Sequence, residues 1–199
     1  MLKVGVLASG RGSNLQAILD ECAAGRIPAK VVVVISDKEG APALERGRKA
    51  SAEALFISPK GLKREEYDAK LVAEMRKHGV GLVVLAGYMR LISPLFVKAF
   101  RNKIINIHPA LLPSFPGTHG QRDALEWGAK ISGCTVHFVD EECDHGPIIL
   151  QKAVPVMDDD TVETLSARIL EQEHKALPEA IRLFAEGKLR VEGRRAFRK

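Results

Sequence analysis

Short apolar runs alternate with longer amphipathic stretches along most of this chain. The apolar runs have the length and β-branched content of buried strands, and we expect strands at 2–8, 30–35, 54–57, 81–86, 104–107, 133–139 and 147–153. The amphipathic stretches predict helices at 14–24, 41–50, 63–77, 94–99, 120–127 and 161–186, with Pro178 kinking or splitting the last one. This alternation is typical of βαβ units. The expected fold class is therefore α/β: a single domain with a largely parallel, twisted sheet flanked by helices.

The length and charge of the chain limit its organisation. Its 199 residues are 46% hydrophobic and 28% charged, which suits one globular domain. The formal net charge is +5, but the last ten residues carry five basic groups and one acidic group, so the other 189 sum to +1 (25 basic minus 24 acidic). We therefore predict a domain over 1–189 and a basic, solvated C-terminal tail over 190–199, and we expect no nucleic-acid partner.

The sequence disfavours several classes of protein. No stretch approaches the roughly 18 uninterrupted apolar residues of a membrane span, and the N-terminus lacks an export signal, so we expect a cytoplasmic protein without a membrane partner. Cys22, Cys134 and Cys143 are an odd number without a CxxC pair, which argues against a disulfide framework and a cysteine zinc site. Because HExxH and EF-hand spacings are also missing, no metal is predicted.

A glycine-rich loop, SGRGSN at 9–14, follows the first predicted strand. Ligands of open α/β sheets bind beyond the carboxyl ends of the strands, and a glycine loop that leads into a helix can hold a phosphate there. The dinucleotide fingerprint GxGxxG would need glycine at position 15, where the chain has Leu15, so one phosphate is favoured over a pyrophosphate. Asp37, at the end of the second strand, keeps a dinucleotide-binding interpretation open, and an ordinary turn is the remaining alternative.

Asn106 and His108 lie two residues apart near the end of a predicted strand, just before Pro109. Strand alternation places both side chains on the same side of the sheet. An amide NH2 can stabilise a developing oxyanion, and an imidazole can donate or accept a proton near neutral pH. The pair therefore suits a tetrahedral intermediate at a carbonyl carbon, and a hydrogen-bonded structural pair is the alternative.

Two further loops carry candidate residues. The segment 111–120 is long and apolar, its prolines would stiffen it over the site, and we predict that His119 lines that site. In the acidic loop 140–146, Asp144 is the main candidate, because a carboxylate near His108 would favour the imidazolium and could accept a proton from an attacking amine. For the other acidic residues a solvated turn is the alternative. Structural roles are expected for the remaining histidines, His78, His137, His145 and His174.

The segment 87–92 follows the fourth predicted strand and exposes apolar residues beside one arginine, Arg90. Such a surface suits a flat heteroaromatic ligand with an acidic tail, and a helix-entry loop with core contacts is the alternative. Arg64, at the start of a predicted helix, is on its own typical of a surface charge.

Taken together, these motifs resemble those of the phosphoribosylglycinamide formyltransferases of purine biosynthesis, the small single-domain type with a Rossmann-like formyltransferase fold. The resemblance covers nearly the whole chain and rests on GRGSN at 10–14, NIHPALLP at 106–113, PGTH at 116–119 and the stretch 133–147 that contains Asp144. It implies direct formyl transfer from 10-formyltetrahydrofolate to the amine of phosphoribosylglycinamide. The implied partners are these small molecules, with the folate as cosubstrate and no tightly bound cofactor, and the oligomeric state stays open.

The resemblance also implies roles for individual residues. The residue matching His108 acts as the general acid, the one matching Asn106 holds the formyl oxygen, and the one matching Asp144 raises the histidine pKa and relays protons. Phosphoribosyl contacts are implied for Gly12, Ser13, Asn14 and Glu173, and folate contacts for Arg64, Met89, Arg90, Leu91, Ile92, Asp140, Glu141, Glu142 and Cys143. The chain departs from the family at Leu170, where a polar or basic side chain often helps to bind the phosphate, and at Asp37, where asparagine is common.

Related folate enzymes share the same three side chains, so the chemistry alone does not separate this transfer from formylation of an aminoacyl-tRNA or hydrolysis of formyltetrahydrofolate. The tRNA enzymes add a C-terminal domain and the hydrolases usually add an N-terminal one, and we expect 199 residues to hold neither. A dinucleotide-binding oxidoreductase or a nucleotide-sensing module is the alternative from another class. That alternative leaves Asn106, His108 and Asp144 unexplained.

Overall fold

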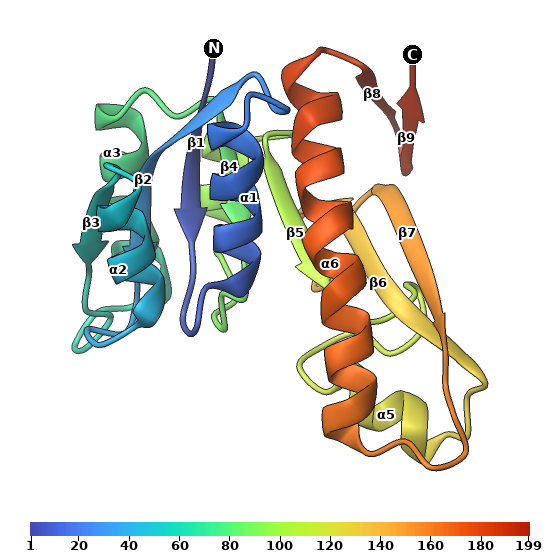
Figure 1. The fold of residues 1–199 in the computed structure, drawn as a ribbon. Coiled ribbons are helices and arrows are strands. Elements are labelled where there is room, and N and C mark those ends of the chain that lie inside the picture. The colour runs from blue at the N-terminus through green and yellow to red at the C-terminus, as the bar shows by residue number, and fades with distance from the viewer. The chain divides into compact units, whose positions relative to one another are not determined.

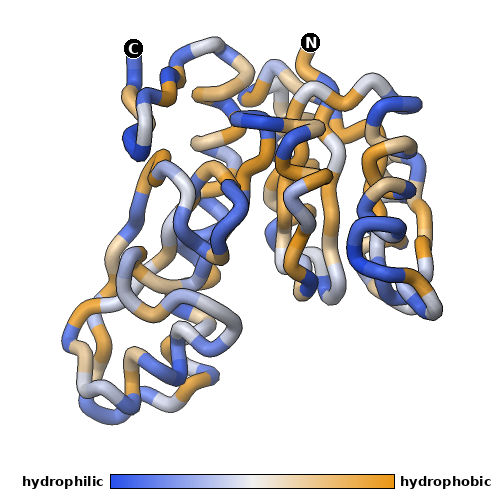
Figure 2. Tube along the Cα trace, turned by 180° about the vertical axis from the view of Figure 1, so that it is seen from behind, coloured by the Kyte–Doolittle hydropathy of each residue, from blue (hydrophilic) through white to orange (hydrophobic).

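The computed structural model describes residues 1–199. The chain forms two compact units, Met1–Ile105 and Asn106–Lys199. Figure 2 shows that the hydrophobic segments of each unit coincide largely with its strands and with the helix faces that cover them, while the connecting loops are mostly hydrophilic. Each unit therefore buries a core of its own, as the alternation of apolar and polar segments requires.

The first unit is an α/β sheet in which every strand pair is parallel. Its strands are β1 (Leu2–Leu7), β2 (Ala29–Ser36), β3 (Glu53–Phe56) and β4 (Leu82–Leu85), in the spatial order β3-β2-β1-β4. Its helices are α1 (Ser13–Ala23), α2 (Pro42–Lys49), α3 (Arg64–Lys77) and α4 (Pro94–Ala99). Helix α1 packs on β2, and α2 packs on β2 and β3 (Figure 1). The near-continuous valine and isoleucine content of β2 fits a strand that is covered on both faces.

The second unit is built around an antiparallel pair and a long helix. Strand β5 (Ile104–His108) crosses the boundary between the units along the chain, and β6 (Ile131–Phe138) pairs in antiparallel fashion with β7 (Ile148–Pro155). Helix α5 (Gly120–Glu126) precedes β6, and α6 (Val162–Ala185) packs on both β6 and β7 (Figure 1). Two short strands, β8 (Leu189–Glu192) and β9 (Arg195–Arg198), form a hairpin whose second strand pairs in parallel with β7.

The structure confirms the predicted α/β class with its mostly parallel strand pairing and flanking helices, and it contains all seven predicted strands and six predicted helices within a few residues of the expected bounds. Of the two outcomes predicted at Pro178, a kink or a split, the split is wrong, because α6 continues through this residue, and the kink stays a prediction. Pro178 is buried together with Leu177 and Ile181, and packing of this face on the sheet offsets the backbone hydrogen bond that proline cannot donate. None of the helices combines the length and apolar character that a bilayer span requires.

The predicted basic tail has secondary structure that the sequence pattern did not indicate. Strands β8 and β9 are only four residues each, too short for a clear alternation of apolar and polar positions. Gly193 has a φ of 55° at the turn between them, which is the conformation that tight hairpins require and that glycine adopts without strain. The proposed boundary between 189 and 190 stays a prediction; the segment forms a hairpin, and most of its residues are exposed.

Gly133→Ala is expected to lower the free energy of unfolding by about 2 kcal/mol or more, since a Cβ at this position of β6 would lie 2.0 Å from the backbone oxygen of Lys152 on β7. Urea unfolding of both proteins measures the difference. Gly40→Ala is the control, because a Cβ there meets nothing within 4 Å, and it should change the unfolding free energy by less than about 0.5 kcal/mol. Equal unfolding midpoints for the native protein and Gly133→Ala would contradict this close approach of β6 and β7.

Candidate active site

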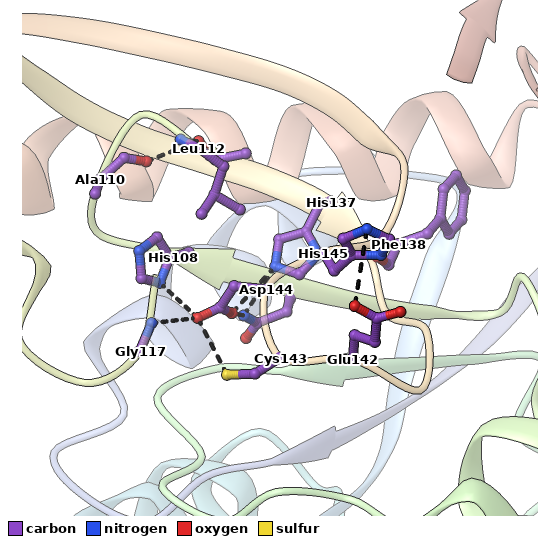
Figure 3. Close-up of polar contacts among 12 residues, drawn as sticks. His108, Ala110, Leu112, Gly117, His137, Phe138, Glu142, Cys143, Asp144 and His145 are labelled. Carbon is purple, nitrogen blue, oxygen red and sulfur yellow. Dashed lines mark hydrogen bonds and ion pairs between the residues drawn. The ribbon is translucent and has the colours of Figure 1, made fainter. Parts of the chain in front are cut away.

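Four polar side chains meet at the carboxyl ends of β5 and β6 in the second unit. Asn106 and His108 project from β5, His137 comes from the end of β6, and Asp144 lies in the loop that joins β6 to β7. Figure 3 shows the Asp144 carboxylate lying between the two imidazole rings. The predicted trio of Asn106, His108 and Asp144 is therefore brought together, with His137 added to it.

Asp144 is the centre of this cluster. Its Oδ2 accepts a hydrogen bond of 2.8 Å from the backbone amide of Gly117 and lies 3.3 Å from Nδ1 of His108. Its Oδ1 accepts from Nδ2 of Asn106 at 3.3 Å and lies 3.5 Å from Nε2 of His137. Asp144 also has a φ of 51°, a left-handed backbone conformation that is strained for a residue with a side chain. The Gly117 amide and the side chains of Asn106, His108 and His137 thus orient the carboxylate, although the backbone conformation of Asp144 is strained.

The environment of Asp144 keeps its carboxyl group ionised. Burial alone would raise its pKa, but the contact with the His137 imidazole, the hydrogen bond from the Gly117 amide and the charge of His108 outweigh burial and lower the pKa from 3.8 to about 2. Because the folded state holds the proton less tightly than the unfolded chain, ionised Asp144 stabilises the fold above about pH 4. That contribution is lost as the pH falls toward about 2.

His108 is 2% exposed, and both of its ring nitrogens have partners. Nε2 lies 2.8 Å from the backbone oxygen of Phe115, and because a carbonyl can only accept, this nitrogen carries the proton. Burial lowers the pKa of His108 below its usual 6.5, while the charge of Asp144 and the Phe115 carbonyl act in the opposite direction. Asp144 thus raises the pKa as expected, but burial has the larger effect and the net shift is downward.

His137 belongs to the cluster, although a purely structural role was expected for it. Its Nδ1–H donates to the backbone oxygen of Phe138 at 2.8 Å, which leaves the Nε2 lone pair to accept from Nδ2 of Asn106 at 3.2 Å. Both amide hydrogens of Asn106 are then engaged, one by His137 and one by Asp144. The available signal in the sequence was the position of His137 at the carboxyl end of a strand, where ligand-facing residues gather.

The loop that follows β5 is held over β6 by a short chain of hydrogen bonds. Thr135 Oγ1 accepts from the backbone amide of Leu112 at 3.0 Å and donates to the Ala110 oxygen at 2.7 Å. Gln151 on β7 adds a bond of 2.8 Å to the Leu112 oxygen. Gly120 leaves room beside the cluster, since a Cβ there would lie 3.4 Å from Nε2 of His108. These contacts fix the loop whose Phe115 oxygen and Gly117 amide face His108 and Asp144.

In the first unit, the structure joins two of the predicted ligand-binding loops. The Ser9 hydroxyl accepts from the Met89 amide at 2.9 Å, and the Ser9 amide donates to the Gly87 oxygen at 3.0 Å. Gly12 precedes α1 with a φ of 71°, and a Cβ there would lie 2.8 Å from Ala43. The other predicted residues of this unit are Ser13 and buried Asn14 in the first turn of α1, exposed Arg64 at the start of α3, exposed Met89 and Leu91, and half-buried Arg90 and Ile92.

The remaining predicted residues lie in the second unit. Glu173 is buried on α6, and exposed His119 immediately precedes α5. The loop residues Asp140, Glu141, Glu142 and Cys143 are half-buried or exposed, and Cys143 Sγ lies 3.5 Å from Asp144 Oδ2. No group of three or more His, Cys, Asp or Glu side chains, including the cluster around Asp144, has an arrangement that could hold a metal ion. Cys143 therefore contacts the cluster.

The fold and the position of the cluster are typical of an α/β enzyme, whose ligands bind at the carboxyl ends of the strands. The formyl transferase family model matches residues 2–181. The chain belongs to that family.

Several relatives are similar over nearly the whole chain. The phosphoribosylglycinamide formyltransferase of Escherichia coli is 44% identical over 191 residues, which are 96% of this chain and 90% of that protein. The crystal structure of glycinamide ribonucleotide transformylase 1 from Symbiobacterium toebii has 57% sequence identity and a TM-score of 0.98, covering 100% of this chain and 94% of that one. The trifunctional purine biosynthetic protein adenosine-3 of Chironomus tentans is 47% identical over 192 residues, and the chain spans 14% of its length.

An NMR titration should find the pKa of the His108 imidazole below 6.5, and lower still in Asp144→Asn, because the substitution removes the nearby negative charge and leaves the burial that disfavours the imidazolium. Asp140→Asn is the matched control, since Asp140 contacts His145 and should leave the His108 midpoint in place. A His108 midpoint that rises or does not move in Asp144→Asn would contradict the proposed coupling.

Proposed function

We propose that the chain transfers the formyl group of 10-formyltetrahydrofolate directly to the amine of 5-phosphoribosylglycinamide, giving formylglycinamide ribonucleotide in de novo purine biosynthesis. The observation that carries this proposal is the buried cluster of Asn106, His108 and Asp144 in a member of the formyl transferase family. The names of the relatives that match over nearly their full length support this substrate.

The reaction needs one new bond, one broken bond and one transferred proton. The amine nitrogen attacks the formyl carbon, and the carbonyl oxygen gains negative charge in a tetrahedral intermediate. The bond from this carbon to the folate nitrogen then breaks, and the folate nitrogen takes up a proton as the amine gives one up. No covalent bond to the protein is required, so the protein must supply oxyanion stabilisation and proton transfer.

In the proposed mechanism His108 is the general acid and Asn106 donates a hydrogen bond to the formyl oxygen. In the resting cluster the Nε2–H of His108 is bonded to the Phe115 oxygen, and the Asn106 amide to Asp144 and His137. The Asn106–Asp144 contact is long, at 3.3 Å, and is the one that a stronger acceptor can replace. A developing oxyanion is such an acceptor, and its charge raises the pKa of the adjacent imidazole as the intermediate forms.

Asp144 tunes His108 and relays protons in this mechanism. Its pKa of about 2 keeps it ionised before the reaction, so it attracts the positive charge that His108 acquires. The same low pKa makes it a weak base, and it therefore holds a proton from the attacking amine only transiently.

The substrate contacts are proposed from the family resemblance. We assign Gly12, Ser13, Asn14 and Glu173 to the phosphoribosyl group, and Arg64, Met89–Ile92 and Asp140–Cys143 to the folate. His119 stays a prediction as a further residue lining the site. The position of Gly12 before α1 and the bond between Ser9 and Met89 support the glycine loop and the 87–92 loop as ordered binding elements. Leu170 offers no polar group to a phosphate, which is a departure from the family pattern.

The proposal is tested by the absorbance change when the purified protein meets a 10-formyltetrahydrofolate analogue, with and without phosphoribosylglycinamide. Deformylation that depends on the ribonucleotide is expected. Deformylation without it would instead indicate a hydrolase, and no deformylation in either mixture would favour the nucleotide-binding module. Stoichiometric binding of a nicotinamide cofactor would point to that last class as well.

His108→Ala and Asp144→Asn are each expected to lower turnover by about 100-fold or more, the range measured for loss of an acid–base or oxyanion group. Steady-state kinetics with both substrates measures the loss, and the unfolding midpoint checks that the fold is kept. His78→Ala, which removes an imidazole that lies beside Glu74 on α3, is the control. Near-normal turnover in either cluster variant would refute its assigned role.

A further inference from the structure

The C-terminal hairpin, strands β8 and β9, is fastened to the body of the second unit at several points. Ile148 at the start of β7 pairs with Arg195 at the start of β9. Arg198 donates to Glu179 on α6 at 3.3 Å, and Glu179 also forms an ion pair of 3.0 Å with Lys152 on β7. These contacts hold the turn of the hairpin beside the loop that carries Asp144.

Arg194, in the turn of the hairpin, contacts that loop directly. Its Nη2 donates to the backbone oxygen of His145 at 2.9 Å, and its Nη1 lies against the nitrogens of the His145 imidazole. His145 Nδ1 lies 2.9 Å from the carboxylate of Asp140 at the other end of the loop. Arg194 therefore places a positive charge and a directed hydrogen bond on a loop whose other charged side chains are acidic.

The loop needs such support because its backbone is constrained on both sides of His145. Asp144 has a φ of 51°. A Cβ on Gly146 would lie 1.9 Å from the backbone oxygen of Phe138, so the chain returns tightly against the end of β6. The hydrogen bond from the Gly117 amide to the Asp144 carboxylate depends on this backbone conformation of residues 144–146. Arg194 binds the backbone oxygen of His145, which directly follows Asp144.

We propose that Arg194 is a positioning residue for the formyl-transfer reaction, acting through the His145 carbonyl to keep the Asp144 carboxylate aimed at Gly117 and His108. This inference rests on the proposed function and extends it to a residue outside the cluster. It also gives the basic C-terminal segment a role that involves neither nucleic acid nor a polyanion.

The expected signature is a loss of turnover with little loss of stability. Arg194 is exposed, and a solvent-exposed charged contact contributes little to folding. Displacing a reacting group by a fraction of an ångström, in contrast, has a large effect on catalysis.

The test compares Arg194→Ala with Arg194→Lys, which keeps the charge and one directed donor, and with Arg190→Ala. Arg190 is the matched control, because its side chain contacts only Glu192 and Phe197 within the hairpin. For each protein we would measure kcat, both KM values, the thermal midpoint and the hydrogen exchange rate of the Gly117 amide, which Asp144 protects.

Arg194→Ala should lower kcat about tenfold with the KM for phosphoribosylglycinamide unchanged within about twofold. Its Gly117 amide should exchange faster, Arg194→Lys should recover most of the turnover, and Arg190→Ala should match the native protein. Native turnover and exchange in Arg194→Ala, or the same losses in Arg190→Ala, would overturn the proposal. If the native protein itself transferred no formyl group, the proposed function would fail, while Gly117 exchange would still report whether Arg194 positions Asp144.

Discussion

The site depends on one buried negative charge. The Asp144 carboxylate accepts the Gly117 amide and the Asn106 amide and lies beside two imidazoles, so it ties together the loop after β5, β5 itself, β6 and the loop after β6. A carboxylate in this position would be costly without partners, and the partners it has hold its pKa at about 2. The geometry of every polar group in the cluster follows from satisfying this charge.

Much of the fold and the centre of the site could be predicted from local sequence. Strand and helix periodicities placed thirteen elements, and strand alternation put Asn106 and His108 on one side of β5. Asp144 was identified because it lies in an acidic loop at the end of a strand. The elements and the proximity of these three side chains are confirmed, because each prediction used a periodicity or an edge of the sheet, which the sequence specifies locally, while their roles stay predictions.

The remaining contributions come from tertiary structure. Phe115 and Gly117 act through their backbone oxygen and amide, and no side chain in the sequence identifies such groups. A structural role is expected for His137 because a histidine inside a strand is usually structural, and only the fold shows that its Nε2 lies near the Asn106 amide. The sequence pattern does not indicate the hairpin of β8 and β9, because its strands are short and its contacts with β7, His145 and Glu179 join residues that are far apart in the chain. The predicted cytoplasmic location, the domain boundary at 189 and the remaining substrate contacts stay predictions.

In the proposed reaction, the hydrogen bonds within the cluster affect the competition between the amine and water for the formyl group. Asn106 and His108 direct their N–H groups to acceptors within the protein, so the resting site presents no spare donor with which to polarise a formyl group. A formyl oxygen gains such a donor only by displacing an internal acceptor, which becomes favourable once an attacking amine has placed negative charge on that oxygen. Water is a weaker nucleophile than an amine and generates that charge less readily. In the proposed reaction, the internally satisfied cluster therefore favours transfer to the amine over hydrolysis of the formyl donor.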